Sequence, residues 1–397
     1  MVRWASSGAM ALTGRPDGPP LGPPARLVDR LDALAAPFPG LDPLALLAER
    51  AAGAGLRRGG RVSCGGSSRL LRAIDGWLAV SLPRPDDLDT VPAWLELGDG
   101  SGPRSDGPDA TWQVVRGTVP GRARAELVAR AALVGLAAAA LPASDAPARR
   151  PPIVRRRLGA APPRPDLRGV VVVDLTSLWA GPLCGALLAG AGATVVKVEA
   201  TRRPDGARAG PPDVFDRLNG AKRSVALDFA DWADAARLAE LVRHADVVLE
   251  ASRPRALEQL GLRAAELVAG GGPQVWVSVT GYGRRGHDGT RVAFGDDAAV
   301  AGGLVVRDAT GPLFCADAVA DPASGLAAAG ACVGALASGG RWLIDVAMDA
   351  VAADLAGDTL PVPPGVVAAA PRADPPQCRA AALGRDTAAV LGELGIP

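Results

Sequence analysis

The sequence predicts an α/β protein with a doubly wound, mostly parallel (Rossmann-like) sheet domain and a smaller α+β domain. Three observations lead to this prediction. Short apolar runs bounded by turn residues alternate with helical patterns in the C-terminal half, which is typical of a buried parallel sheet. Asp75-Gly76 lies between two apolar segments in the N-terminal half and is a strong hairpin signal. A segment rich in proline and arginine, 141–169, separates the halves and is typical of a linker.

The sheet domain is expected to begin with the apolar run GVVVVDLT, 169–176. A helix starting at Pro182 and a strand over 194–200 follow, which completes a strand–helix–strand unit. Further strands are expected over 223–229, 245–251 and 274–283, with a helix over 231–244 between the first two. This alternation predicts the doubly wound arrangement.

The N-terminal half has a different pattern. A hairpin is expected over 69–82, and helices over 86–96 and 121–141. We therefore divide the chain into a small α+β domain (1–150), a Pro/Arg-rich linker (151–166) and the Rossmann-like domain (167–397).

Composition excludes several classes of function. The formal net charge is +1, so neither nucleic acid nor an anionic membrane surface is an expected partner. The five cysteines are scattered and never in C-x-x-C spacing, which favours a reducing cytosol and no zinc site. The N-terminus lacks the apolar core of a signal peptide, and the longest apolar run, 131–141, is too short to cross a bilayer. A soluble, cytoplasmic protein without a metal is expected.

Familiar catalytic motifs are missing from the sequence. No G-x-G-x-x-G follows the first strand, and there is no Walker loop, G-x-S-x-G or H-E-x-x-H. The two histidines, His244 and His287, lie in segments expected at the surface. Carboxylates, arginines and glycine-rich turns remain as the groups that can carry chemistry.

Asp321 is the carboxylate that the pattern singles out. It lies directly before Pro322, at the start of a long helix of small residues. An aspartate at the N-cap with proline in the first turn is an ordinary way to begin a helix. From this pattern alone, Asp321 is either a cap or a reactive residue.

Several segments resemble the class III CoA-transferases, the CaiB/BaiF family, which includes formyl-CoA and carnitine CoA-transferases and alpha-methylacyl-CoA racemases. The resemblance covers roughly residues 167–350. It is carried by DLTSLWAGPLCGALLAGAGATVVKVEATRRPDGAR, LNGAKRSVALDF, ADVVLEASRPRALEQLGL, VWVSVTGYGRRG and FGDDAAVAGGL, in family order. The tail AAALGRDTAAVLGELGI and the hairpin RAIDGWLAVSL also look like family segments.

The order of these segments is unusual. In the family the small domain follows the nucleotide-binding half, whereas here the similar segment precedes it. The segments 7–21 and 301–315 also resemble each other. The chain therefore looks like a rearranged relative, close to a circular permutation, with one short segment present twice.

The resemblance implies that Asp321, in AVADPASG, is the nucleophile. In the family this carboxylate attacks an acyl-CoA thioester, giving a mixed anhydride and then an aspartyl-CoA thioester from which CoA passes to an acceptor acid. The helix N-terminus is expected to keep Asp321 ionised. The implied substrate pocket comprises Trp179, Gly181, Gly281, Tyr282, Gly283, Asp296, Asp297, Gly302 and Gly303.

Binding of CoA requires cations for its phosphates. By resemblance these are Lys222, Arg223, Arg253 and Arg208, with Glu199 facing the nucleotide. The implied reactants are an acyl-CoA and a carboxylic acid, without a permanently bound cofactor. A homodimer is expected, either interlocked as in the family or simpler.

Two departures from the family pattern leave alternatives open. Asp296 stands where the racemases have a histidine, which disfavours racemase chemistry, and Trp179 replaces a glutamine common in the transferases. Beside CoA transfer, we therefore keep a catalytically silent CoA-binding relative or partner subunit, and as a minor alternative an acyl-CoA racemase or dehydratase.

Overall fold

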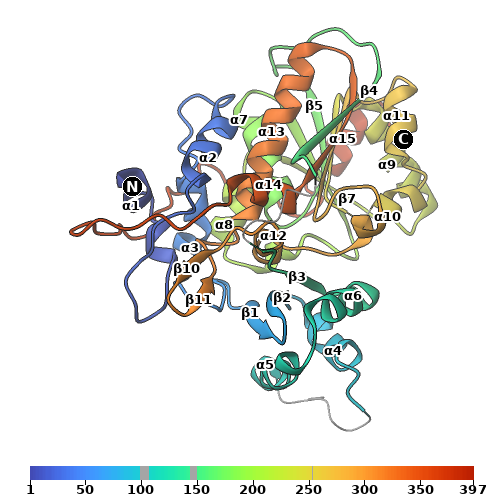
Figure 1. Ribbon diagram of the computed structural model, residues 1–397. Coiled ribbons are helices and arrows are strands. Elements are labelled where there is room, and N and C mark those ends of the chain that lie inside the picture. The colour runs from blue at the N-terminus through green and yellow to red at the C-terminus, as the bar shows by residue number, and fades with distance from the viewer. Residues whose placement is uncertain (99–106, 144–149, 253) are drawn as a thin grey trace.

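A seven-stranded sheet forms the centre of the protein (Figure 1). The computed structural model describes residues 1–98, 107–143, 150–252 and 254–397. The strand order is β4-β12-β9-β8-β5-β6-β7, and β4 alone runs antiparallel to its neighbour. The strands are β4 (Ile153–Gly159), β5 (Val171–Leu175), β6 (Thr194–Ala200), β7 (Arg223–Leu227), β8 (Val247–Glu250), β9 (Val275–Thr280) and β12 (Arg341–Ala347). The predicted doubly wound α/β fold is confirmed.

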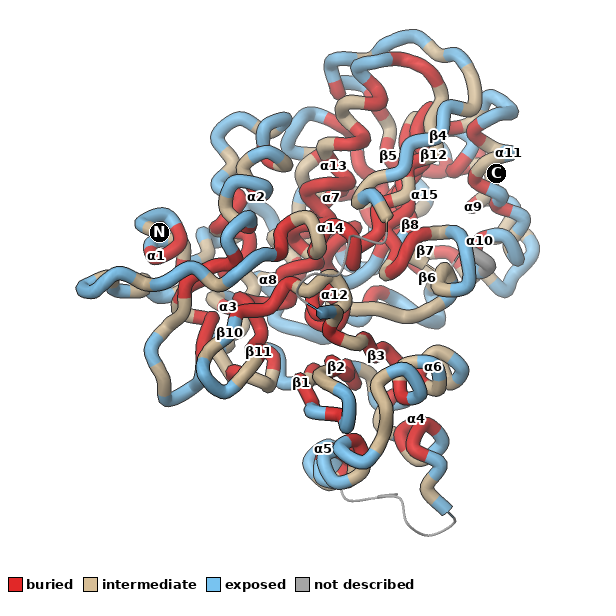
Figure 2. The backbone as a smooth tube through the Cα atoms, in the orientation of Figure 1, coloured by how far each residue is buried: buried red, intermediate tan, exposed pale blue. Residues whose placement is uncertain are grey.

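Helices cover both faces of this sheet. Alternate strand residues point to opposite faces, so Val172 joins one core with α7 (Ala180–Gly190) and α13 (Ala320–Ser338), while Val173 joins another. The second core contains residues of α9 (Trp232–His244), α11 (Ala264–Ala269) and α15 (Thr387–Glu393). Figure 2 shows the buried strands between these layers.

Helix α13 is long and apolar enough to cross a membrane by length and composition, but 72% of its most apolar window is buried inside the protein. It packs closely against α7, because a Cβ at Gly325 would lie 2.5 Å from the carbonyl oxygen of Ala180. Burial of this kind is typical of the central helix of a globular fold.

A small α+β unit occupies residues 68–141. Its antiparallel sheet has the order β1-β2-β3, from β1 (Ser68–Ala73), β2 (Gly76–Ser81) and β3 (Ala137–Ala140), and it carries α4 (Pro85–Trp94), α5 (Gly107–Thr118) and α6 (Arg124–Val134). The predicted Asp75-Gly76 hairpin is confirmed. The helix expected over 121–141 is wrong at its end, because Gly135 adopts a left-handed conformation, with φ of 78°, and β3 follows.

Most of residues 1–66 belongs with the large sheet instead of the small unit, although Arg61 to Ser63 pair with the start of β1. They form α1 (Val2–Ser6), α2 (Leu27–Ala35) and α3 (Glu49–Ala54). Trp4, Leu27 and Leu47 share the core that contains α7 and α13. The expected boundary at residue 150 therefore does not describe the packing, because local pattern does not reveal which core an amphipathic helix joins.

The expected linker also contains structure. β4 lies within 151–166 and pairs with β12, for example Arg155 with Ile344. An exposed, arginine-rich edge strand protects a sheet from pairing with another chain, and such a composition is easily mistaken for that of a linker.

The remaining elements connect these layers. They are α8 (Pro212–Asn219), α10 (Pro254–Gln259), α12 (Gly295–Ala301), α14 (Met348–Leu355) and the hairpin β10 (Val306–Asp308) and β11 (Gly311–Leu313).

Candidate active site

Four carboxylates gather where α12 meets the start of α13. Asp296 and Asp297 lie in the first turn of α12, Asp317 lies in the turn before α13, and Asp321 lies in the first turn of α13. Asp296, Asp297 and Asp317 are buried, with at most 8% of each residue exposed. Asp321 is half-buried. It is therefore the carboxylate of this group that keeps access to a reactant.

Asp321 is not the helix cap. The helix begins at Ala320 with Val319 in the cap position, so Asp321 lies within the first turn, and its amide donates a hydrogen bond to the Ala318 carbonyl at 2.8 Å. The interpretation of Asp321 as the helix cap is therefore wrong, because the turn before α13 already starts the helix at Ala320. That turn is strained, since Ala316 and Ala318 both have positive φ, 51° and 41°.

Gly295 contacts the Asp321 carboxylate directly. Its backbone amide donates a hydrogen bond to that carboxylate. An ideal Cβ at Gly295 would lie only 2.3 Å from Oδ2 of Asp321. A glycine is therefore required for this approach of backbone to side chain.

The pKa of Asp321 is raised to about 7. Burial is the largest cause, and the negative charges of Asp296 and Asp297 add to it, while Arg50 and the Gly295 amide act in the opposite direction. The expectation that the helix N-terminus keeps Asp321 ionised is corrected, because burial raises the pKa of this carboxyl to about 7.

The two α12 carboxylates also have raised pKa values. Burial raises the pKa of Asp297 to about 7, although its Oδ1 accepts hydrogen bonds from Ser81 Oγ at 2.8 Å and from the Phe294 amide at 2.9 Å. Its Oδ2 has no hydrogen-bond partner among the described residues. Burial and the charge of Asp317 raise the pKa of Asp296 to about 6, against hydrogen bonds from Ser68 and Ser63.

The sequence reasoning missed Arg50, the cation of this cluster. Its Nε lies 2.9 Å from Oδ2 of Asp317 and its Nη2 lies 2.5 Å from Oδ1, a bidentate ion pair. The guanidinium also lies 4.9 Å from the centroid of the Trp179 ring. No local motif marks this arginine, which lies 267 residues before Asp317 in the chain.

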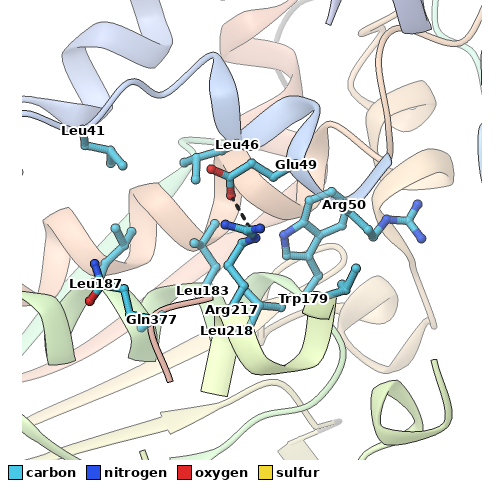
Figure 3. Close-up of a pocket in the computed structure, with 12 residues that line it drawn as sticks. Leu41, Leu46, Glu49, Arg50, Trp179, Leu183, Leu187, Arg217, Leu218 and Gln377 are labelled. Carbon is cyan, nitrogen blue, oxygen red and sulfur yellow. Dashed lines mark ion pairs between the residues drawn. The ribbon is translucent and has the colours of Figure 1, made fainter. Parts of the chain in front are cut away.

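A cavity of about 350 Å³ adjoins Arg50 and Trp179 (Figure 3). Five leucines from residues 41–46, α7 and α8 line it, and Arg217, 3.9 Å from Glu49, lies on its polar side. In Figure 3 the Trp179 indole lies between the Arg217 and Arg50 side chains. Trp179 and Arg50 thus line the cavity, and Arg50 in turn contacts Asp317 of the carboxylate cluster.

The expected phosphate-binding cations are all ion-paired where they are described. Lys222 Nζ is buried, 2.8 Å from both Asp174 Oδ2 and the Pro182 carbonyl oxygen. Arg208 forms a bidentate pair with Glu199. Arg223 pairs with the exposed Glu393 of α15. Arg253 lies outside the described residues. Lys222, Arg208 and Arg223 nevertheless line one shallow depression beside Ala380 and Ala381.

The expected pocket glycines allow close packing or left-handed backbone. A Cβ added at Gly181 would lie 2.3 Å from the Thr176 side chain. A Cβ at Gly281 would lie 2.5 Å from Ala293 Cβ, and one at Gly302 would lie 2.4 Å from the Asp349 carbonyl oxygen. Gly283 and Gly303 have φ of 84° and 78°.

Tyr282, between two of these glycines, is buried under the guanidinium of Arg291, which lies 4.0 Å from its ring centroid. Its hydroxyl has no hydrogen-bond partner among the described residues. Within the described ranges, no group of three histidine, cysteine, aspartate or glutamate side chains is placed to hold a metal ion.

Comparison with known proteins gives a family match over the region that holds Asp321. The model of CoA-transferase family III matches residues 167–374. An acyl-CoA transferase of Fusarium pseudograminearum is 32% identical over 44% of this chain and 42% of its own length. A succinyl-CoA–D-citramalate CoA-transferase of Chloroflexus aurantiacus is 36% identical, over 36% of this chain and 37% of its own. The chain thus spans about two fifths of the length of these curated relatives.

Among solved structures, a hypothetical protein of Mycobacterium tuberculosis is 32% identical, with a TM-score of 0.44, over 49% of this chain and 57% of that one. A CaiB/BaiF family protein of Brucella suis is 30% identical, also with a TM-score of 0.44, over 47% of this chain and 54% of that one.

Proposed function

Because the chain belongs to CoA-transferase family III, we propose that it moves coenzyme A from an acyl-CoA donor to a carboxylic acid acceptor, with Asp321 as the nucleophile. The observation that carries this proposal is the position of Asp321. It is the half-buried member of the carboxylate cluster, hydrogen-bonded by the Gly295 amide, and its segment AVADPASG resembles the nucleophile motif of the family.

The proposed reaction proceeds through covalent intermediates on Asp321. Its carboxylate attacks the thioester carbonyl, and CoA leaves as the thiolate, giving an acyl–aspartyl anhydride. The thiolate then attacks the aspartyl carbonyl, giving an aspartyl-CoA thioester and the free donor acid. The acceptor carboxylate repeats these two steps in reverse and leaves as the new acyl-CoA. Enforced proximity compensates for the weak nucleophilicity of a carboxylate.

The chain's own residues support the first step. The Gly295 amide holds the carboxylate in one orientation, and the raised pKa of Asp321 makes it more basic than a solvated aspartate. Arg50 opposes the rise in pKa, so a substantial fraction of Asp321 is ionised at pH 7.

For the phosphates of CoA we propose Arg223 and Arg208, together with Arg253 as the resemblance implies. Arg223 is partly exposed and its partner Glu393 is exposed, so an incoming phosphate can replace that carboxylate at small cost. Lys222 is fully enclosed with Asp174. We propose that Lys222 stabilises the fold beneath the phosphate-binding arginines through its ion pair with Asp174, and that it does not contact a phosphate.

A transfer assay tests the proposed function. The purified chain is incubated with acetyl-CoA or succinyl-CoA and with oxalate, glutarate or D-citramalate, acids and donors that appear in the names of the relatives, and new CoA thioesters are measured by liquid chromatography and mass spectrometry. We expect the wild type to form a new thioester. Asp321→Asn should lower the transfer rate at least roughly 1,000-fold, as on removal of a covalent nucleophile. Asp29→Asn, which changes an exposed aspartate on α2, should keep wild-type activity. Equal activity of both variants would reject Asp321.

A silent CoA-binding relative is the second candidate, favoured by Trp179 beside the cavity and by the paired cations. It predicts that CoA binds in calorimetry and that no donor in a wider panel yields a new thioester. The minor racemase alternative rests on the protonatable pair Asp296 and Asp321. It predicts deuterium uptake at the α-carbon of an acyl-CoA in D₂O. The expected homodimer and cytoplasmic location stay predictions.

A further inference from the structure

Arg50 reaches the carboxylate cluster from a part of the chain that the family match does not cover. It lies on α3, within residues 1–66, whereas the family model matches 167–374. Thr13, from the same N-terminal segment, accepts a hydrogen bond from the Ala316 amide at 3.0 Å. Residues 1–66 therefore contact the strained turn that precedes Asp321 and also supply its nearby cation.

The contacts of Arg50 fix its guanidinium in one position. Two of its nitrogens bind the two oxygens of Asp317, and its plane lies near the Trp179 ring. A planar fork held on a carboxylate and an aromatic face is an arrangement that lysine cannot reproduce. Asp317 is 1% exposed on its side chain, so without Arg50 it would be a buried charge without a partner.

Several charged groups face Asp321. Asp296 and Asp297 of α12 raise its pKa, and Arg50 of α3 is the charged side chain that lowers it most. Arg50 also lowers the pKa of Asp296 and of Asp317. One guanidinium thus balances several carboxylates, and its removal acts on all of them in the same direction.

We infer that Arg50 is a positioning residue for the nucleophile, through which residues 1–66 complete a catalytic site that the family-matched region does not contain alone. The inference rests on the proposed function. It makes the N-terminal segment part of the enzyme's chemistry, acting through charge on Asp321 and through the geometry of Asp317.

The direct test measures the ionisation of Asp321 and requires no turnover. The full-length chain is labelled with ¹³C at the aspartate carboxyl, and the Asp321 resonance is assigned by its loss in Asp321→Asn. A pH titration then gives its pKa. Arg50 is the charged side chain that lowers the pKa of Asp321 most, and a nearby opposite charge typically changes a carboxyl pKa by about one pH unit or more, so Arg50→Gln is expected to raise the pKa of Asp321 by about one pH unit. An unchanged pKa in a folded Arg50→Gln protein overturns the inference.

Further variants separate charge from folding. Arg50→Lys keeps the charge without the fork and is expected to give a smaller rise. The double variant Arg50→Gln with Asp317→Asn removes both charges, so the Asp317 carboxylate is not left buried without its ion-pair partner. This variant is therefore expected to fold even if Arg50→Gln alone does not. It is expected to raise the pKa of Asp321 less than Arg50→Gln does. Arg57→Gln, an exposed arginine of the same segment, is the matched control and should change nothing.

Transfer kinetics add a second readout that a purely structural role would not move. For Arg50→Gln the midpoint of the pH–rate profile should rise together with the pKa of Asp321. The rate below the midpoint should then fall about tenfold for each pH unit by which the midpoint rises. A lower rate with the same midpoint contradicts the inference. If the wild type transfers no CoA while the titration of Asp321 still responds to Arg50→Gln, the proposed function fails and the electrostatic role of Arg50 stands.

Discussion

The backbone amide of Gly295 donates to the carboxylate of Asp321, and the space between them excludes even a methyl group. Gly295→Ala is therefore expected to displace the carboxylate and to lower kcat/KM about 100-fold, the usual cost of a misplacement of about 1 Å. Gly190→Ala is the control, since a Cβ there meets nothing within 4 Å. The comparison of kcat/KM at matched circular dichroism checks this, and normal activity of Gly295→Ala would mean that the contact does not matter.

The raised carboxyl pKa values predict that stability falls as pH rises. Asp297 has a folded pKa of about 7, above the ordinary unfolded value of about 3.9, so the folded protein binds more protons between these values. Its contribution is complete below the unfolded pKa and is lost as pH rises through about 7. Asp297→Asn should therefore lessen the fall in unfolding free energy between about pH 5 and pH 8 by roughly 1–3 kcal/mol. Urea denaturation at the two pH values measures it, and parallel behaviour of variant and wild type would show that Asp297 titrates normally.

Trp179 is expected to restrict the donor. It lines the cavity and supports the Arg50 guanidinium, and glutamine at this position would leave a larger space. Trp179→Gln should lower KM for donors with longer acyl chains relative to acetyl-CoA, and it should lose about 0.5–1 kcal/mol of stability with the cation–π contact. Steady-state kinetics over acyl-CoAs of increasing length checks this. If the ratio of KM values for longer acyl-CoAs to that for acetyl-CoA does not change, the acyl group does not bind beside Trp179.

Lys222 and Arg223 are neighbours in sequence with different predicted roles. Lys222→Met leaves Asp174 buried without its partner and should cost about 3–5 kcal/mol of unfolding free energy. Arg223→Gln breaks a partly exposed pair and should cost less than about 1 kcal/mol, yet weaken CoA binding. Denaturation and calorimetric CoA titration measure the two effects. The opposite pattern would return Lys222 to the phosphate site.

Five strands of the large sheet, β5 to β9, were predictable from sequence, because buried parallel strands are continuous apolar runs between turns. The edge strand β4 lies in the expected linker, and β12 was not among the expected strands. The motif pattern also indicated Asp321, Asp296 and Asp297, which the structure brings together. Arg50 and Asp317 were not predictable, because their pairing joins residues 267 positions apart through a tertiary contact. The association of Trp4 and Leu27 with the large sheet's core was hidden for the same reason.

The burial of individual charged side chains was the other property that could not be predicted from the sequence. The pattern correctly suggested a helix start near Asp321, but the pKa of that residue depends on burial and on carboxylates from another helix. Likewise, Lys222 looked like a phosphate ligand by motif, whereas its ammonium is enclosed by Asp174 and the Pro182 carbonyl.

The decisive measurement for Asp321 is mass spectrometry of the intact chain and its peptides after brief incubation with succinyl-CoA. We expect a covalent acyl or CoA adduct on the peptide that contains Asp321, removed by hydroxylamine and absent in Asp321→Asn. A chain that binds CoA but carries no adduct, or one modified equally in Asp321→Asn, would contradict the role of Asp321 as nucleophile.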